Sequence, residues 1–216
     1  LLICVCWADA DGGIPAISVP VTSGFTWALQ NSATFTNDAA TRFGRVSVYA
    51  IVNAGAMSAT TSFVATQAGS TIQNQFALYE FSGVATTTPL DTSAFTSNTG
   101  PSIPTTADLV TTATDLIFVS YEGVDGTAET VGSGYTAGIA NTILTNAGKS
   151  QYLLNQSAGT ISTAWGSSNT KWGCSALAFK SASISATATP AGVSMTSAQN
   201  APTTSGSAVA TPSGVS

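Results

Sequence analysis

The sequence predicts an all-β fold: a two-sheet antiparallel β-sandwich of jelly-roll-like type. Three observations support this prediction. Turn residues punctuate the first 180 residues at short intervals, and the segments between them have the length of strands. These segments are rich in β-branched and aromatic residues, which favour strands. No segment has the sustained apolar periodicity and capping residues of a helix.

Individual segments justify the strands in turn. The first, Leu1 to Trp7, is apolar and is interpreted as a core strand, because it has neither the basic region nor the cleavage site of a signal peptide. In residues 45–53, Val46 and Val48 share one strand face while Ser47 and Tyr49 share the other. Further strands are expected at residues 25–30, 60–66, 75–81, 115–121, 151–155 and 171–179, with proline-containing connections around Pro89 and 101–104.

Charge is scarce along the chain. It has 5 Lys and Arg, 10 Asp and Glu, no His, a net charge of -5 and 7% charged residues, against about a quarter in an ordinary soluble domain. Without a basic stripe, nucleic acid is not an expected partner. No apolar run approaches the ~20 residues of a membrane-spanning helix, so no membrane insertion is expected. The absence of His excludes Ser-His-Asp triads and imidazole-based zinc sites.

The composition changes after Lys180 to Ser, Ala, Thr, Pro and Gly without aromatic residues, which divides the chain into a sandwich domain (1–180) and a tail (181–216). Within the tail, residues 185–194 nearly repeat as residues 207–216, an offset of 22 residues. Repeats of this kind form small stacked units or flexible linkers. Both interpretations, a short β-repeat and a linker, stay open at this point.

Four segments carry a resemblance to a known family: residues 1–9, 76–84, 88–91 and 172–180. Together they resemble a β-sandwich module that recurs in large bacterial secreted or surface proteins and in structural proteins of tailed bacteriophages. The resemblance implies the fold and supplies no catalytic residues. The tail pattern Ala-Thr-Pro-x-Gly-Val-Ser is similar to repeats of long phage virion proteins.

The resemblances imply a non-enzymatic virion structural protein, either a capsid decoration or cement subunit or a fibre-like appendage, at the virion surface. The implied partners are the major capsid protein or tail proteins and further copies of the chain, with a trimer as the expected state. No cofactor is expected. The alternative is a carbohydrate-binding or adhesive module of a secreted bacterial surface protein, located outside the cell and binding a host-surface glycan.

Candidate site residues are few. Trp165 lies in a Gly/Ser-rich segment and is the one tryptophan expected at the surface, where its ring could stack on a sugar, whereas Trp7, Trp27 and Trp172 are expected in the core. No metal ligands and no catalytic residues are assigned. The match Ser168-x-x-Lys171 has no supporting motif around it.

Two acidic patterns and the cysteines complete the candidates. Glu80 and Glu122 could act as a glycosidase pair only if they converged in one cleft, and structural roles are favoured. Asp9-Ala-Asp11-Gly12 has the opening of a calcium loop but lacks the later ligands, so a connecting turn is favoured. Cys4 and Cys6 share a strand face; a bond from either to Cys174 stays open, and free thiols are favoured.

Overall fold

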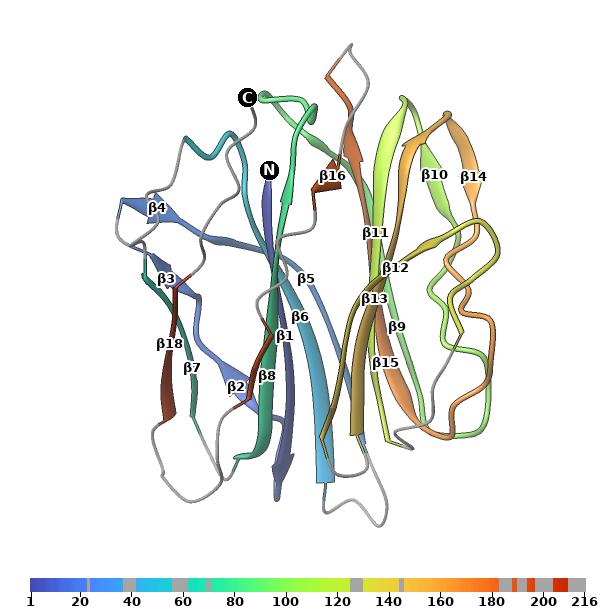
Figure 1. Cartoon of the computed structure of the whole chain (residues 1–216). Helices are drawn as coiled ribbons and strands as arrows, with labels where there is room; N and C mark the ends of the chain where they lie inside the picture. The colour runs from blue at the N-terminus through green and yellow to red at the C-terminus, as the bar shows by residue number, and fades with distance from the viewer. Residues whose placement is uncertain are drawn as a thin grey trace.

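Figure 1 shows the computed structural model of the chain, in which the described residues contain strands and no helix. The described residues are 1–22, 24–36, 42–55, 62–68, 71–124, 130–143, 146–182, 188–189, 194–196 and 204–209. The strands are β1 (Leu2–Asp11), β2 (Ala16–Ile17), β3 (Val21–Thr22), β4 (Phe25–Thr26), β5 (Ala28–Thr36), β6 (Arg42–Ile51), β7 (Ser62–Ala68), β8 (Thr71–Phe81), β9 (Leu90–Asn98), β10 (Leu109–Thr111), β11 (Asp115–Gly123), β12 (Thr136–Ile143), β13 (Asn146–Gln156), β14 (Gly159–Ile161), β15 (Trp172–Lys180), β16 (Ala188–Thr189), β17 (Ser194–Thr196) and β18 (Thr204–Val209). The predicted all-β class is confirmed.

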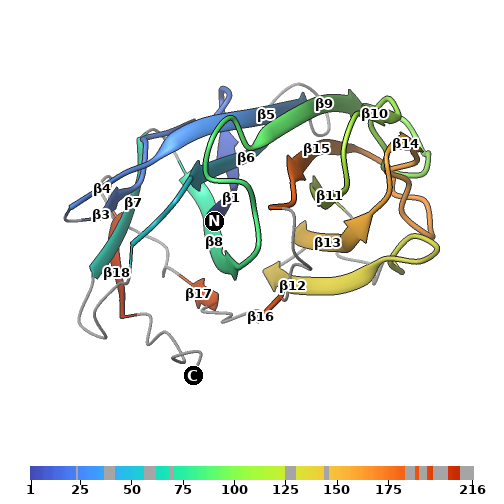
Figure 2. The same cartoon turned by 90° about the horizontal axis from the view of Figure 1, so that it is seen from above.

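Two large antiparallel sheets form the sandwich. The β1 sheet has the strand order β16-β8-β1-β6-β5, with β17 also paired to β8, and the β11 sheet has the order β12-β13-β11-β15-β9. Seen from above, the two sheets face each other, and β5 and β9 follow one another along the same side (Figure 2). There the Asn31 side chain of β5 donates to the Ala94 carbonyl of β9 at 2.9 Å. This contact ties the two sheet edges together.

The central core lies between these sheets, and strand alternation fills it. From β1, Ile3, Val5 and Trp7 point inward; from β11, Leu116 and Phe118 do the same, and all are at most 1% exposed. The aromatic rings interlock edge to face: the ring centroids of Tyr79 and Phe118 are 5.0 Å apart at 69°. Burial of this apolar surface is the main favourable term for the fold.

Two further layers cover the outer faces of the sandwich. A small sheet with the order β18-β7-β3-β4, to which β2 also pairs, lies beside the β1 sheet, and the β10-β14 pair lies beside the β11 sheet (Figure 2). As a result, β1, β11 and β15 are buried along both faces. A two-layer sandwich with one solvated face per sheet would show strict alternation of apolar and polar residues, so these unbroken buried runs are explained by the outer layers.

Most predicted strands agree with the structure to within about five residues at each end, but the expected strand 25–30 is divided between β4 and β5, which ends at Thr36. Six strands were not predicted. The first strand extends to Asp11, beyond the expected end at Trp7, and the turn follows at Gly12, whose φ of 78° lies in the left-handed region that favours glycine. The unpredicted strands before the tail are β2, β3, β9, β10, β12 and β14.

The tail contributes short strands to the edges of the sheets. β16 and β17 pair with β8, and β18 pairs with β7 over six residues from Thr204 to Val209. The described tail residues thus extend the edges of the sandwich sheets. Most of the two repeat copies, residues 185–194 and 207–216, lies outside the described residues.

Candidate functional site

Trp165, the predicted ligand contact, is a core residue. Its side chain is 2% exposed, and its ring meets that of Tyr121 edge to face with centroids 4.6 Å apart. The Trp165 backbone N–H donates to the Pro104 carbonyl, which fixes the segment over the β11 sheet. This corrects the sequence expectation of an exposed ring, because Gly/Ser-rich residues around a large aromatic side chain do not reveal that the segment folds inward. The other three tryptophans are buried as predicted.

Glu80 and Glu122 do not converge. Glu80 is exposed and stands opposite Leu2 in the β1 sheet, whereas Glu122 is buried beside Ala8 and Asp9. Leu2 and Asp9 are separated by seven residues of β1, or about 23 Å at the usual rise of a strand. Carboxylates that cooperate in glycoside hydrolysis are about 5 to 10 Å apart. The arrangement therefore offers no glycosidase pair from these residues.

Asp9 and Asp11 both lie within β1, so they do not form a loop around a cation. Asp9 is 1% exposed and points into the sandwich. Among the described residues, no group of three or more His, Cys, Asp or Glu side chains is placed to hold a metal ion. Ser168 is exposed in the connection before β15.

The three cysteines are free thiols, and the sandwich separates them into two groups. Cys4 and Cys6 lie on the outer face of the β1 sheet with their sulfur atoms 3.6 Å apart, in the cluster that contains Trp27 and Phe76. Cys174 lies in the outer core of the β11 sheet. Both sheets stand between the two groups, so a bond from Cys4 or Cys6 to Cys174 is ruled out.

We expect these thiols to be unreactive in the native state, because all three are 0% exposed and burial raises the pKa of Cys4 and Cys174 well above the ordinary value. A colorimetric thiol reagent should label no cysteine in native buffer and all 3 cysteines in denaturant without reductant. Recovery of a single thiol in denaturant would instead show that Cys4 and Cys6 are oxidised.

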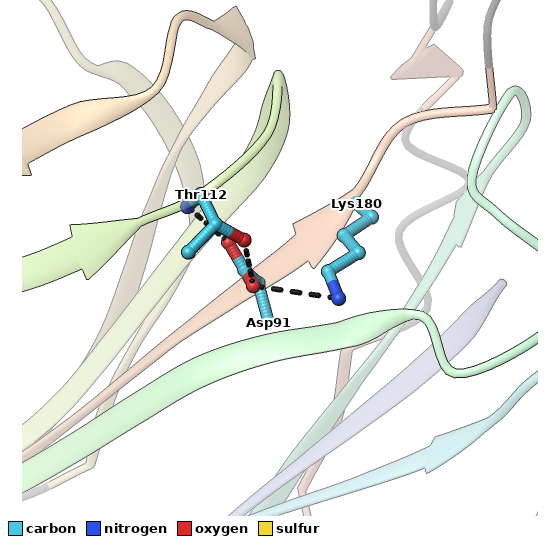
Figure 3. A network of polar contacts seen from close by, with 3 residues as sticks. All are labelled: Asp91, Thr112 and Lys180. Atoms are coloured by element: carbon cyan, nitrogen blue, oxygen red, sulfur yellow. Dashed lines mark hydrogen bonds and ion pairs between the residues drawn. The ribbon is translucent and has the colours of Figure 1, made fainter.

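A polar cluster that the sequence analysis did not identify lies at one end of the β11 sheet (Figure 3). Asp91 of β9 is its centre. The Thr112 backbone N–H donates to Asp91 Oδ2 at 2.6 Å, and the Thr112 hydroxyl donates to Asp91 Oδ1 at 2.7 Å. Lys180 Nζ of β15 is 3.5 Å from Asp91 Oδ1. One carboxylate is thus held by two donors and one cation.

Asp115, the first residue of β11, completes this cluster. It stands opposite Lys180 in the β11–β15 ladder, is 0% exposed, and its carboxyl group is close enough to that of Asp91 for the two to interact electrostatically. Neither Asp115 oxygen has a hydrogen-bond partner. Two buried carboxyl groups this close repel each other unless one of them carries a proton.

The electrostatics assign that proton to Asp115. Burial, followed by the charge of Asp91, raises the pKa of Asp115 to about 7, and Lys180 only partly opposes this shift. For Asp91, burial also acts to raise the pKa, but the Thr112 hydrogen bonds and Lys180 outweigh it and lower the value. The pair therefore consists of one anion, Asp91, and one neutral acid, Asp115, with Lys180 balancing the anion.

A second acidic pair lies at the opposite end of β11, inside the sandwich. Glu122 is 3% exposed and faces Asp9 of β1. Burial raises the pKa of Glu122 well above its ordinary value, and Asp9 raises it further, while the backbone N–H groups of Ala8 and Arg45 act in the opposite direction. Because Gly148 and Gly173 flank Glu122 on the neighbouring strands, the Glu122 carboxyl has no side-chain partner in its own ladder positions.

The described residues thus define an antiparallel β-sandwich in which four of the 10 acids form two pairs, Asp91 with Asp115 and Asp9 with Glu122. No protein-family model, no curated protein and no solved structure matches the chain. In the described part of the chain, no helix is present that could cross a membrane.

Proposed function

We propose that the protein is a non-enzymatic structural subunit of a bacteriophage virion, a capsid decoration or fibre-like component that acts by packing against neighbouring subunits. The observation that supports this most is the near absence of charge on its surface. Only 10 acidic and 5 basic residues are present, and Asp9, Asp115, Glu122 and Lys149 among them are buried. A neutral polar surface can be buried against a neighbour without the large cost of desolvating ions.

The sheet edge at β9 is a suitable contact region for such packing. The β9 edge itself lies against β5, but the Phe95 side chain on this strand is 65% exposed and can pack against another chain. The residues exposed beside it on β9 are Ser93 and Ser97, which carry no charge. Contacts of this composition should depend little on salt concentration, since salt screens interactions between charges.

The alternative, a carbohydrate-binding or adhesive module, no longer has Trp165 as a ligand contact. Among the described residues, the exposed large aromatic side chain is Phe95. A sugar-binding role would have to use this ring. The substitution Phe95→Asp, described next, therefore tests both functions.

Association of the purified chain tests the packing function. We expect sedimentation velocity to show concentration-dependent assembly that changes little between low and high salt. Phe95→Asp should weaken it, because the substitution places an unpaired charge in the contact. Thr86→Asp, which adds the same charge at an exposed residue after β8, is the control and should leave assembly intact.

Electron cryomicroscopy of particles from the native source then decides where the subunit sits. Density for this sandwich that repeats with the symmetry of a capsid or tail is the expected result. A chain that stays monomeric at every concentration, is absent from particles and binds glycans through Phe95 would contradict the proposal in favour of the adhesive module.

A further inference from the structure

The central strand β11 carries a buried acid near each end, and each acid faces a second acid on another strand. Asp115 contacts Asp91 of β9, and Glu122 faces Asp9 of β1. The two pairs are about 23 Å apart, because seven residues of β11 separate Asp115 from Glu122. Both acids are at most 3% exposed.

We propose that the folded protein holds two protons, one shared by Asp91 and Asp115 and one on Glu122, and that these protons make the sandwich an acid-stabilised, pH-sensitive structure. In acid, the proton keeps the buried acid of each pair neutral beside its neighbour. As the pH rises, the buried acids must ionise beside an existing negative charge, and both ends of β11 are destabilised.

The surroundings of Asp115 support the first proton. The charged groups that act on it are Asp91 and Lys180, and its opposite residue on β13 is the uncharged Gln156. Lys180 is 34% exposed in its side chain and pairs with Asp91, so it can compensate one carboxylate of the pair. Thr112 donates to Asp91 and makes no contact of this kind with Asp115.

The surroundings of Glu122 support the second proton, the one on its own carboxyl group. Among the described residues, Asp9 is the titratable group that acts on it. The nearby Arg45 guanidinium donates to Ser32 Oγ and to the Pro15 carbonyl, on the outer face of the β1 sheet. Its backbone N–H, not its charge, contacts Glu122. Glu122 Oε2 has no hydrogen-bond partner, as suits a group that is not fully ionised.

The direction of the pH effect follows from proton counting. Unfolded Asp and Glu ionise near pH 4, at about 3.9 and 4.3, whereas the Asp91–Asp115 pair keeps its proton until about pH 7. Between these values the native state binds more protons than the unfolded state, so stability falls as the pH rises. The lowered pKa of Asp91 has the opposite effect and removes stability only in stronger acid.

The test is the unfolding equilibrium of the full chain between about pH 4.5 and about pH 8, a range that covers most of the window from about pH 4 to about pH 7 and extends above it. For wild type we expect the unfolding constant to rise with pH, by up to about tenfold per pH unit for each proton held, or about 1.4 kcal/mol. Asp115→Asn and Glu122→Gln imitate the protonated acids. Each should reduce the slope and raise stability at pH 8 relative to wild type.

Asp108→Asn is the matched control, because it makes the same Asp-to-Asn change at an exposed residue; it should leave the slope unchanged. Infrared spectroscopy gives an independent measurement. At neutral pH the wild type should show the carbonyl band of protonated carboxyl groups, and the Asp115→Asn/Glu122→Gln double variant should not. A wild-type stability that stays constant or rises towards pH 8, or the absence of this infrared band, would overturn the proposal.

Discussion

Phe118→Ala is expected to destabilise the sandwich more than almost any other single substitution, by about 3 to 5 kcal/mol. Phe118 is 0% exposed at the centre of β11, and its ring meets Tyr79 and Phe81 with centroids 5.0 and 6.2 Å away. Removing the ring leaves a cavity between two large sheets, which cannot close without moving whole strands. Denaturant unfolding followed by tryptophan fluorescence measures the loss, which is a large part of the roughly 5 to 15 kcal/mol typical of a native domain.

Phe95→Ala is the matched control for this prediction. It removes the same atoms from a ring that is 65% exposed on β9. Exposed substitutions of this kind usually change stability by no more than about 0.5 kcal/mol. Equal losses for the two variants would show that Phe118 does not lie in the core described above.

Gly148→Ala is expected to destabilise the protein by about 1 to 3 kcal/mol through overpacking, although it adds a single methyl group. A Cβ atom at Gly148 of β13 would lie 2.4 Å from the Trp7 ring. That ring cannot easily move, because it is 1% exposed and its N–H donates to Ser120 Oγ at 3.0 Å. Thermal and denaturant unfolding both measure the effect.

Two further variants separate overpacking from a general effect of losing glycine. Gly13→Ala adds a methyl group where no atom lies within 4 Å, and it should leave stability nearly unchanged. Trp7→Phe should make Gly148→Ala less costly, because a smaller ring leaves room for the added methyl group, so the two substitutions should be non-additive. Simple additivity would argue against contact between residues 7 and 148.

Local pattern predicted the strands that build the centre of the molecule, because those strands are apolar on at least one face. Residues 45–53 and 115–121 were recognised in this way and became β6 and β11. β9 and β12 were missed, since they lie at sheet edges and consist mainly of Ser, Thr, Ala, Gly and Asn. Edge strands gain much of their stability from one neighbouring strand, and that contribution is not visible in their own residues.

The candidate site could be predicted only in part. The sequence analysis placed Asp115 at the start of a strand and Lys180 directly after one, but their proximity to Asp91 depends on the strand order β11-β15-β9. Glu122 was weighed only together with Glu80, with structural roles favoured, and its actual acidic neighbour, Asp9, lies on β1, far away in the sequence. Trp165 was misplaced for the same reason: the partner that buries it, Tyr121, is distant in the sequence.

The sequence by itself determined the all-β class, the approximate positions of the central strands, the scarcity of charge and the exclusion of His-dependent chemistry. These properties depend on composition and on period-two alternation, both of which are local. The tertiary structure alone decided that two outer layers cover the sandwich, that Cys174 is separated from Cys4 and Cys6, and that four acids meet as two buried pairs. Such features depend on which strands become neighbours, and the packing of residues far apart along the chain determines that arrangement.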